Sequence, residues 1–79
     1  MAGRRKSGDD APGKRRAEAE ARVANAAHVV VRQRKIAATM RRRNLNARDA
    51  EARLAQLERI LSDFEDRLVA IIAEQANNE

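Results

Sequence analysis

The sequence predicts an all-helical protein, an antiparallel two-helix hairpin that dimerises into a four-helix bundle. From Lys14 onward the 79-residue chain contains no glycine or proline and is rich in alanine, arginine, glutamate and leucine, which is the composition of long helices. Signals that end one helix and begin another stand next to each other around Asn44. Apolar residues on both sides of that point recur at helical spacing.

The first 13 residues differ from the rest of the chain. They contain all three glycines and the only proline, and they show no apolar periodicity. This composition is typical of a disordered segment, and its basic residues make it a basic tail. The sequence therefore divides into a disordered basic tail, 1–13, and a helical hairpin, 14–79.

The first helix is predicted over about 15–43. Its apolar stripe is broad, is interrupted by Gln33, and consists of Val23, Ala26, Ala27, Val29, Val30, Ile36, Ala37 and Met40. The β-branched run 29–31 is also compatible with a strand. We favour a helix because the 3.6-residue pattern continues on both sides of that run.

The turn is predicted at 44–46. Three arginines precede it and suit the negative end of a helix dipole. Asparagine is the commonest residue after glycine in a left-handed C-terminal cap, which is the role expected for Asn44. Asn46 suits the N-cap of the next helix, with Leu45 placed to pack against Ala50. So short a connection favours antiparallel neighbours.

The second helix, about 47–76, has the clearest pattern. Its apolar residues alternate between spacings of three and four, as a and d positions of a heptad do: Ala47, Ala50, Leu54, Leu57, Leu61, Phe64, Leu68 and Ile71. Folding the chain about Leu45 places residues whose numbers sum to about 90 opposite each other. Ile36 is then expected to face Leu54, and Ala26 to face Phe64.

Large core residues are scarce. Of the 34 apolar residues 17 are alanine, and the absence of cysteine excludes disulfides and thiolate metal sites. A monomer of this size is marginal, so we expect a homodimer or a larger protein partner. The apolar surplus on the second helix predicts the interface residues Leu54, Leu57, Ile60, Leu61, Phe64, Leu68, Ile71 and Ile72.

The net charge of +5 is unevenly distributed, with +9 in residues 1–46 and −4 in residues 47–79. Basic residues follow one face of the first helix and the tail, as in proteins that bind a phosphate backbone. The candidate nucleic-acid contacts are Arg4, Arg5, Lys6, Lys14, Arg15, Arg16, Arg32, Lys35, Arg42 and Arg43. The alternative is a solvated face that pairs with the acidic second helix.

Catalysis is not expected. His28 is the only histidine, and no carboxylate lies three or four residues from it, so neither a metal pair nor an oriented base is available locally. We expect no cofactor, no metal and no small-molecule substrate. The longest apolar run, 68–73, is six residues, too short to cross a membrane, and no apolar signal-peptide segment follows the basic N-terminus. The sequence therefore predicts a cytoplasmic protein.

The stretch from Arg32 to Leu68, with Arg32-Gln33-Arg34, the basic turn ending in Asn44, Ala50-Glu51-Ala52-Arg53-Leu54 and Leu57-Glu58, resembles small uncharacterised helical-hairpin proteins of proteobacteria. That resemblance implies a helical hairpin and no particular activity. In architecture alone the chain is also similar to Rop-like RNA-binding hairpin dimers and to the small hairpin protein of the large ribosomal subunit.

The function predicted from these observations is a non-enzymatic protein-interaction or oligomerisation module. The alternative is a small basic protein that binds the backbone of RNA or DNA.

Overall fold

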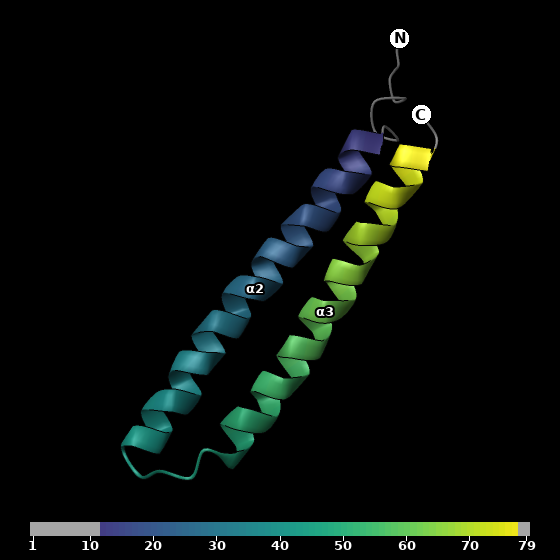
Figure 1. Ribbon diagram of the computed structural model, residues 1–79. Coiled ribbons are helices and arrows are strands. Elements are labelled where there is room, and N and C mark those ends of the chain that lie inside the picture. Colours follow the sequence, from purple (N-terminus) through teal and green to yellow (C-terminus); the bar gives the residue numbers. More distant parts are fainter. Residues whose placement is uncertain (1–11, 78–79) are drawn as a thin grey trace.

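A computed structural model describes residues 12–77 of the chain. It consists of helix α2, Pro12–Arg42, and helix α3, Arg48–Asn77, joined by residues 43–47 (Figure 1). The two helices pack along each other in opposite directions, and no strand occurs in this part of the chain. The predicted two-helix hairpin is therefore confirmed. Within residues 12–77, neither helix is long and apolar enough to span a bilayer.

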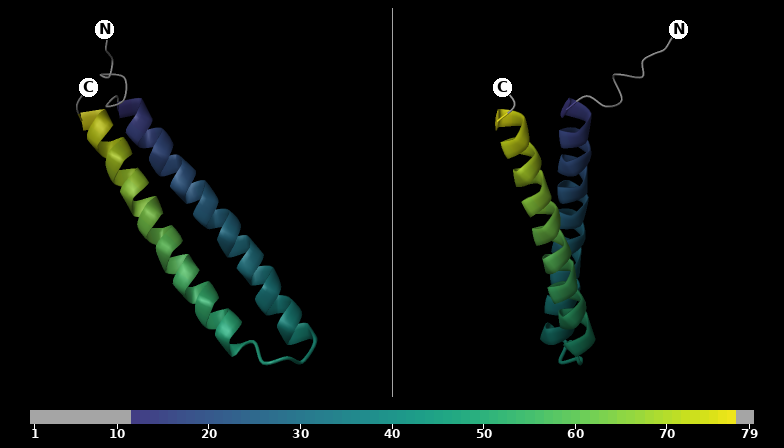
Figure 2. Two further views of the ribbon diagram at one scale, coloured as in Figure 1. Left: turned by 180° about the vertical axis from the view of Figure 1, so that it is seen from behind. Right: turned by 90° about the vertical axis from the view of Figure 1, so that its right-hand side faces the viewer.

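The hairpin is a thin slab, with extents of 61 × 29 × 13 Å. The helices run side by side from behind in Figure 2, and in its side view they overlap near the connecting turn and diverge toward their other ends. Two helices side by side leave both broad faces of the pair exposed. As a result, few side chains can be fully enclosed.

Helix α2 begins at Pro12, earlier than the predicted start near residue 15, so residues 12 and 13 belong to a helix and not to the predicted tail. Proline is well tolerated in the first turn because that turn leaves its N–H groups unpaired. The first turn has no acidic residue and is followed by basic ones, which the helix dipole disfavours. Packing and ion pairs offset this effect, since Ala19 is buried and Arg16 pairs with Glu20. Residues 1–11, and with them most of the predicted tail, lie outside the described residues.

The turn has the predicted left-handed cap. Asn44 has a φ of 60°, its N–H donates to the Arg41 carbonyl at 3.0 Å, and the Leu45 N–H donates to the Met40 carbonyl at 2.8 Å. These two bonds are those of a Schellman motif, in which a left-handed residue closes the last turn of a helix. The cap satisfies two carbonyls at the end of α2 and reverses the chain.

Asn46 is the N-cap of α3, as predicted. Its side-chain Oδ1 accepts a hydrogen bond from the Arg48 N–H at 3.0 Å. The bond satisfies one of the backbone donors that the first turn of a helix leaves unpaired. Asp49 and Glu51 add negative charge in that first turn, where the helix dipole favours it.

Replacing Asn46 with alanine is expected to lower the free energy of unfolding by about 1 kcal/mol, because alanine cannot accept the Arg48 N–H. Urea unfolding followed by circular dichroism measures this effect. Asn25→Ala is the matched control, since Asn25 is exposed in the middle of α2 and caps nothing. Equal midpoints for the two variants would contradict the capping role.

Buried side chains are few and small. The buried residues within 12–77 are Ala19, Val30, Ala37 and Ala47. In α2 the residues that face α3 follow alternating spacings of four and three, and they are Ala19, Val23, Ala26, Val30, Gln33, Ala37 and Met40. This is an a/d seam like that of α3. Alanines on α2 opposite leucines and Phe64 on α3 let the two helices approach closely.

Gln33 belongs to this seam, whereas the sequence pattern treats it as an interruption. Its Nε2 donates to the Ala50 carbonyl at 2.9 Å, in a part-buried position. Ile36, expected to face Leu54, is instead 46% exposed. The reason is that a strict four–three repeat through Val30 and Ala37 places residue 36 at the flank of the helix.

Candidate functional site

The two broad faces of the hairpin differ in how the helices are joined across them. On the face that we call the paired face, Arg34 bonds to Glu58 at 3.2 Å and Arg41 to Glu51 at 3.0 Å. In heptad terms these residues lie at e positions of the two helices, which face each other in an antiparallel pair. Side chains of opposite charge thus bridge the seam on this side.

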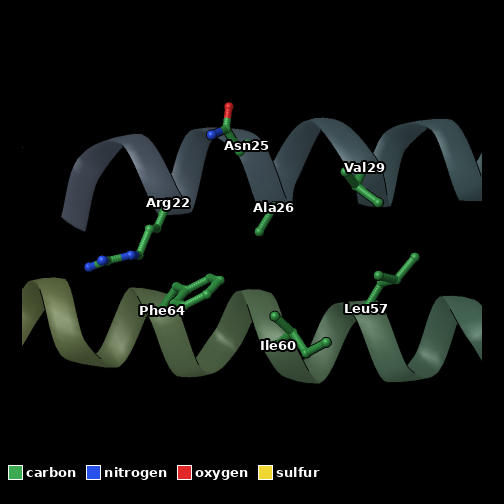
Figure 3. A pocket seen from close by; sticks show the side chains of 7 residues that line it. All are labelled: Arg22, Asn25, Ala26, Val29, Leu57, Ile60 and Phe64. Carbon is green, nitrogen blue, oxygen red and sulfur yellow. The ribbon is translucent and has the colours of Figure 1, made fainter. Parts of the chain in front are cut away.

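The other broad face carries the g positions, and we call it the groove face. An apolar groove of about 270 Å³ opens there between the helices, near the middle of the hairpin (Figure 3). Its lining residues are Arg22, Asn25, Ala26, Val29, Leu57, Ile60 and Phe64. Ala26 and Val29 point from α2 toward α3, and Leu57 and Phe64 point back. Ala26 and Phe64 thus share one groove, in line with the predicted register.

The groove exposes apolar surface at its centre. Val29 is 38% and Ile60 is 46% exposed, and the two lie opposite each other at g positions. On the paired face the corresponding positions near the turn hold ion pairs. On the groove face the ion pair is at the far end of the hairpin, where Arg15 bonds to Glu74 at 3.2 Å. Among residues 12–77, therefore, no ion pair bridges the two helices over the middle of the groove.

Arginines surround this floor. Arg22 lines the groove, and the Arg67 guanidinium lies 5.8 Å from the centroid of the Phe64 ring. That distance is within the range of a cation–π contact. Phe64 is the only aromatic residue in the sequence, so this ring and its arginine form a distinctive feature of the surface.

The structure divides the predicted interface residues into two groups. Half-buried and turned toward α2 are Leu54, Leu57, Leu61, Phe64, Leu68 and Ile71. Ile60 and Ile72 are the exposed members, at 46% and 36%. By helical position Ile60 lies on the groove face and Ile72 on the paired face, so these two do not form one patch.

The predicted nucleic-acid contacts also divide. Arg4, Arg5 and Lys6 lie outside the described residues. Lys14, Arg15 and Arg16 belong to α2, and the two arginines form ion pairs with Glu74 and Glu20. The remaining four are exposed and form no ion pair with a carboxylate of residues 12–77: Arg32, Lys35, Arg42 and Arg43.

In the part of the chain that the structure describes, no cluster of residues suited to metal binding lies at the groove. His28 is exposed on α2. No group of three His, Cys, Asp or Glu side chains in the described part of the chain is placed to hold a metal ion. The chemistry that the groove does offer is an apolar floor with guanidinium donors around it.

Val29 lines the groove, whereas the sequence pattern predicts it in the stripe that faces the second helix. In an antiparallel pair the g positions of the two helices face each other. Positions 29 and 60 sum to 89, close to the value of about 90 that the predicted register requires for facing residues. Applying the register at positions outside the seam identifies the groove pair Val29 and Ile60.

In comparisons with known proteins, no family model, no curated protein and no solved structure matches the chain. The resemblance to proteobacterial hairpin proteins thus stays a prediction.

Proposed function

We propose that this protein is a non-enzymatic helical interaction module, which buries its groove face against another helix, from a second copy or from a larger protein. The observation that carries the proposal is the exposed apolar pair Val29 and Ile60 over the groove, while the buried residues of the described part of the hairpin are three alanines and one valine. A chain with so little enclosed apolar surface gains stability when a partner covers more of it.

The position of the groove adds support. Exposed apolar side chains are common on any protein and need no partner when they occur singly. Here Val29 and Ile60 are continuous with Ala26, Leu57 and Phe64 in one concave surface. Concave apolar surface between two helices is the kind of site into which an amphipathic helix packs.

Affinity capture of the full chain from its native host tests this proposal, with nuclease in the wash. The Ile60→Asp variant is expected to retain none of the proteins that the parent chain captures, including a differently tagged second copy. The reason is that burying an aspartate in the groove is unfavourable when no cation neutralises it. Val69→Asp is the matched control, since Val69 is 65% exposed and lies outside the groove. Equal retention by both variants would contradict the proposal.

A second candidate function is binding to a nucleic-acid backbone. It is supported by Arg32, Lys35, Arg42 and Arg43, which are exposed and unpaired with carboxylates of residues 12–77, whereas Arg34 and Arg41 of α2 are paired. Three of the four lie within about three turns of α2, and Arg43 follows directly after its last residue. Unpaired cations in a row are suited to phosphates, and such binding is independent of sequence.

For this candidate we expect the affinity for duplex DNA or RNA to fall steeply with added salt. With four phosphate contacts on duplex DNA, the logarithm of the binding constant falls with a slope of about −3.6 against the logarithm of salt concentration. Arg32→Gln is expected to reduce that slope by about 1. Arg34→Gln is the matched control, since Arg34 pairs with Glu58. Fluorescence anisotropy measures both, and the absence of binding at low salt would exclude this function.

A further inference from the structure

We infer that the groove face binds an acidic amphipathic helix of another protein, whose apolar side chains enter the groove while its carboxylates meet the surrounding arginines. The inference rests on the proposed function and specifies the partner.

The floor fixes the shape of the occupant. Val29 and Ala26 on one side, and Leu57, Ile60 and Phe64 on the other, line a groove of about 270 Å³ between two helices. The groove is elongated along the helices, because residues 22–29 of α2 and 57–64 of α3 each span about two turns. An elongated apolar groove between helices accepts a third helix, whose anchors recur every three or four residues.

The charges around the groove fix the chemistry of the occupant. By helical position, Arg22 and Arg32 of α2 and Arg53 and Arg67 of α3 lie on the groove face, together with Glu18 and Asp63. These four arginines and two carboxylates give a local net charge of +2.

None of the four arginines forms an ion pair with a carboxylate within residues 12–77. A guanidinium is a planar donor that matches a carboxylate in bidentate geometry. The four arginines lie at the edges of the apolar groove. There they can contact acidic residues on either side of the apolar face of a bound helix.

A second copy of the chain is a poor occupant because it carries the same charge. A two-fold axis parallel to the hairpin would place α2 of one copy over α3 of the other and set Arg22 against the second copy's Arg67, since 22 and 67 sum to 89. An axis perpendicular to it through Ile60 would set the second copy's Arg53 against Arg67, since both lie seven residues from Ile60. Like charges brought together across an interface oppose association. Both two-fold arrangements therefore disfavour a groove-to-groove homodimer.

Two synthetic peptides of about 21 residues, three heptads long, test the inference. Both have leucine at a and d positions and alanine elsewhere, except that one has glutamate and the other lysine at e and g. The full-length protein is titrated with each while its valine and isoleucine methyl groups are observed by NMR. Val29 and Ile60 report on the groove, and Val31 and Val69, both exposed and outside it, are internal controls.

We expect the glutamate peptide to shift the Val29 and Ile60 methyl signals and to bind at least about tenfold more tightly than the lysine peptide. Arg67→Gln is expected to weaken that binding several-fold while circular dichroism shows unchanged helicity. Equal affinity for both peptides, or shifts centred on Val31 and Val69, would overturn the inference. So would equal or larger shifts of the groove methyls on adding duplex DNA.

Sedimentation equilibrium without peptide separates this inference from the proposed function. The acidic-helix partner predicts that the chain alone stays at its monomer mass of 8.8 kDa at micromolar concentration. A dimer that Ile60→Asp dissociates would overturn the inference and support the proposed function in its self-associating form. A monomer that binds neither peptide would overturn the inference, and the capture experiment then decides the proposed function alone.

Discussion

Replacing Val30 with aspartate is expected to unfold the hairpin. Val30 is the largest fully buried side chain of the described residues, 2% exposed, and it faces α3 in the seam of α2. A carboxylate there loses its hydration and has no cation on the apolar seam to replace it, which costs several kcal/mol. Small domains rarely have more than about 3–5 kcal/mol of stability. The substitution therefore removes most or all of the folding free energy.

The adjacent residue supplies the matched control for this prediction. Val31 is also a valine in α2, but it is 44% exposed, so aspartate there keeps its water. We expect Val31→Asp to retain most of the helical circular dichroism signal at room temperature and Val30→Asp to lose it. If both variants kept the same helicity and the same urea midpoint, the seam through Val30 would be wrong.

Replacing Ala37 with leucine is expected to destabilise the hairpin by about 1–3 kcal/mol, although leucine is more apolar. Ala37 is 0% exposed, so the added carbons have no space unless the helices move apart. Since α2 relies on small residues to approach α3, separation at this point weakens the packing on both sides of it. Urea unfolding measures the loss.

The control for Ala37→Leu is the same substitution at Ala24, which is exposed on α2. Leucine and alanine are both strong helix formers, so Ala24→Leu is expected to change the stability by only a few tenths of a kcal/mol. A larger urea midpoint for Ala37→Leu than for the parent chain would show that the seam has room, contrary to the close approach described above.

The hairpin was predictable because its local signals are strong and act through neighbouring residues. The caps at Asn44 and Asn46 need only a few adjacent backbone groups, and both form as predicted. The seam of α3 repeats strictly, so its inward face could be identified without knowledge of α2. The register about Leu45 followed from the short turn, and the ion pairs Arg34–Glu58 and Arg41–Glu51 agree with it.

The inward face of α2 was less predictable because its sequence offers several apolar stripes. Val29, Val30 and Val31 are chemically alike, and only packing against α3 distinguishes the buried one from its exposed neighbours. Gln33 enters the seam because its amide bonds to the Ala50 carbonyl, a contact that depends on the other helix. Long-range contacts of this kind have no local sequence signal, so they become visible only in the folded chain.

The candidate site was partly predictable for the same reasons. Ile60 was expected to lie outside the seam of α3 and to contact a partner, and the structure places it in the groove. Val29, which lies opposite Ile60, and Arg22, which also lines the groove, come from α2. The sequence left open which face of α2 is turned toward α3. Which arginines are paired also depends on the fold, since Arg34 and Arg32 are only two residues apart and differ in this respect.

Protection of a thiol in the groove tests directly whether another protein covers the groove face. The chain has no cysteine, so Ile60→Cys and Val31→Cys each introduce a single reporter, in the groove and outside it. Maleimide labelling is timed in cells of the native host and in dilute purified protein. We expect the reporter at position 60 to be labelled at least about tenfold more slowly in cells, and in a nuclease-treated lysate of those cells, than in the purified protein. The reporter at position 31 is expected to be labelled at about the same rate in all three. Equal slowing at both positions, or none at position 60, would contradict this expectation.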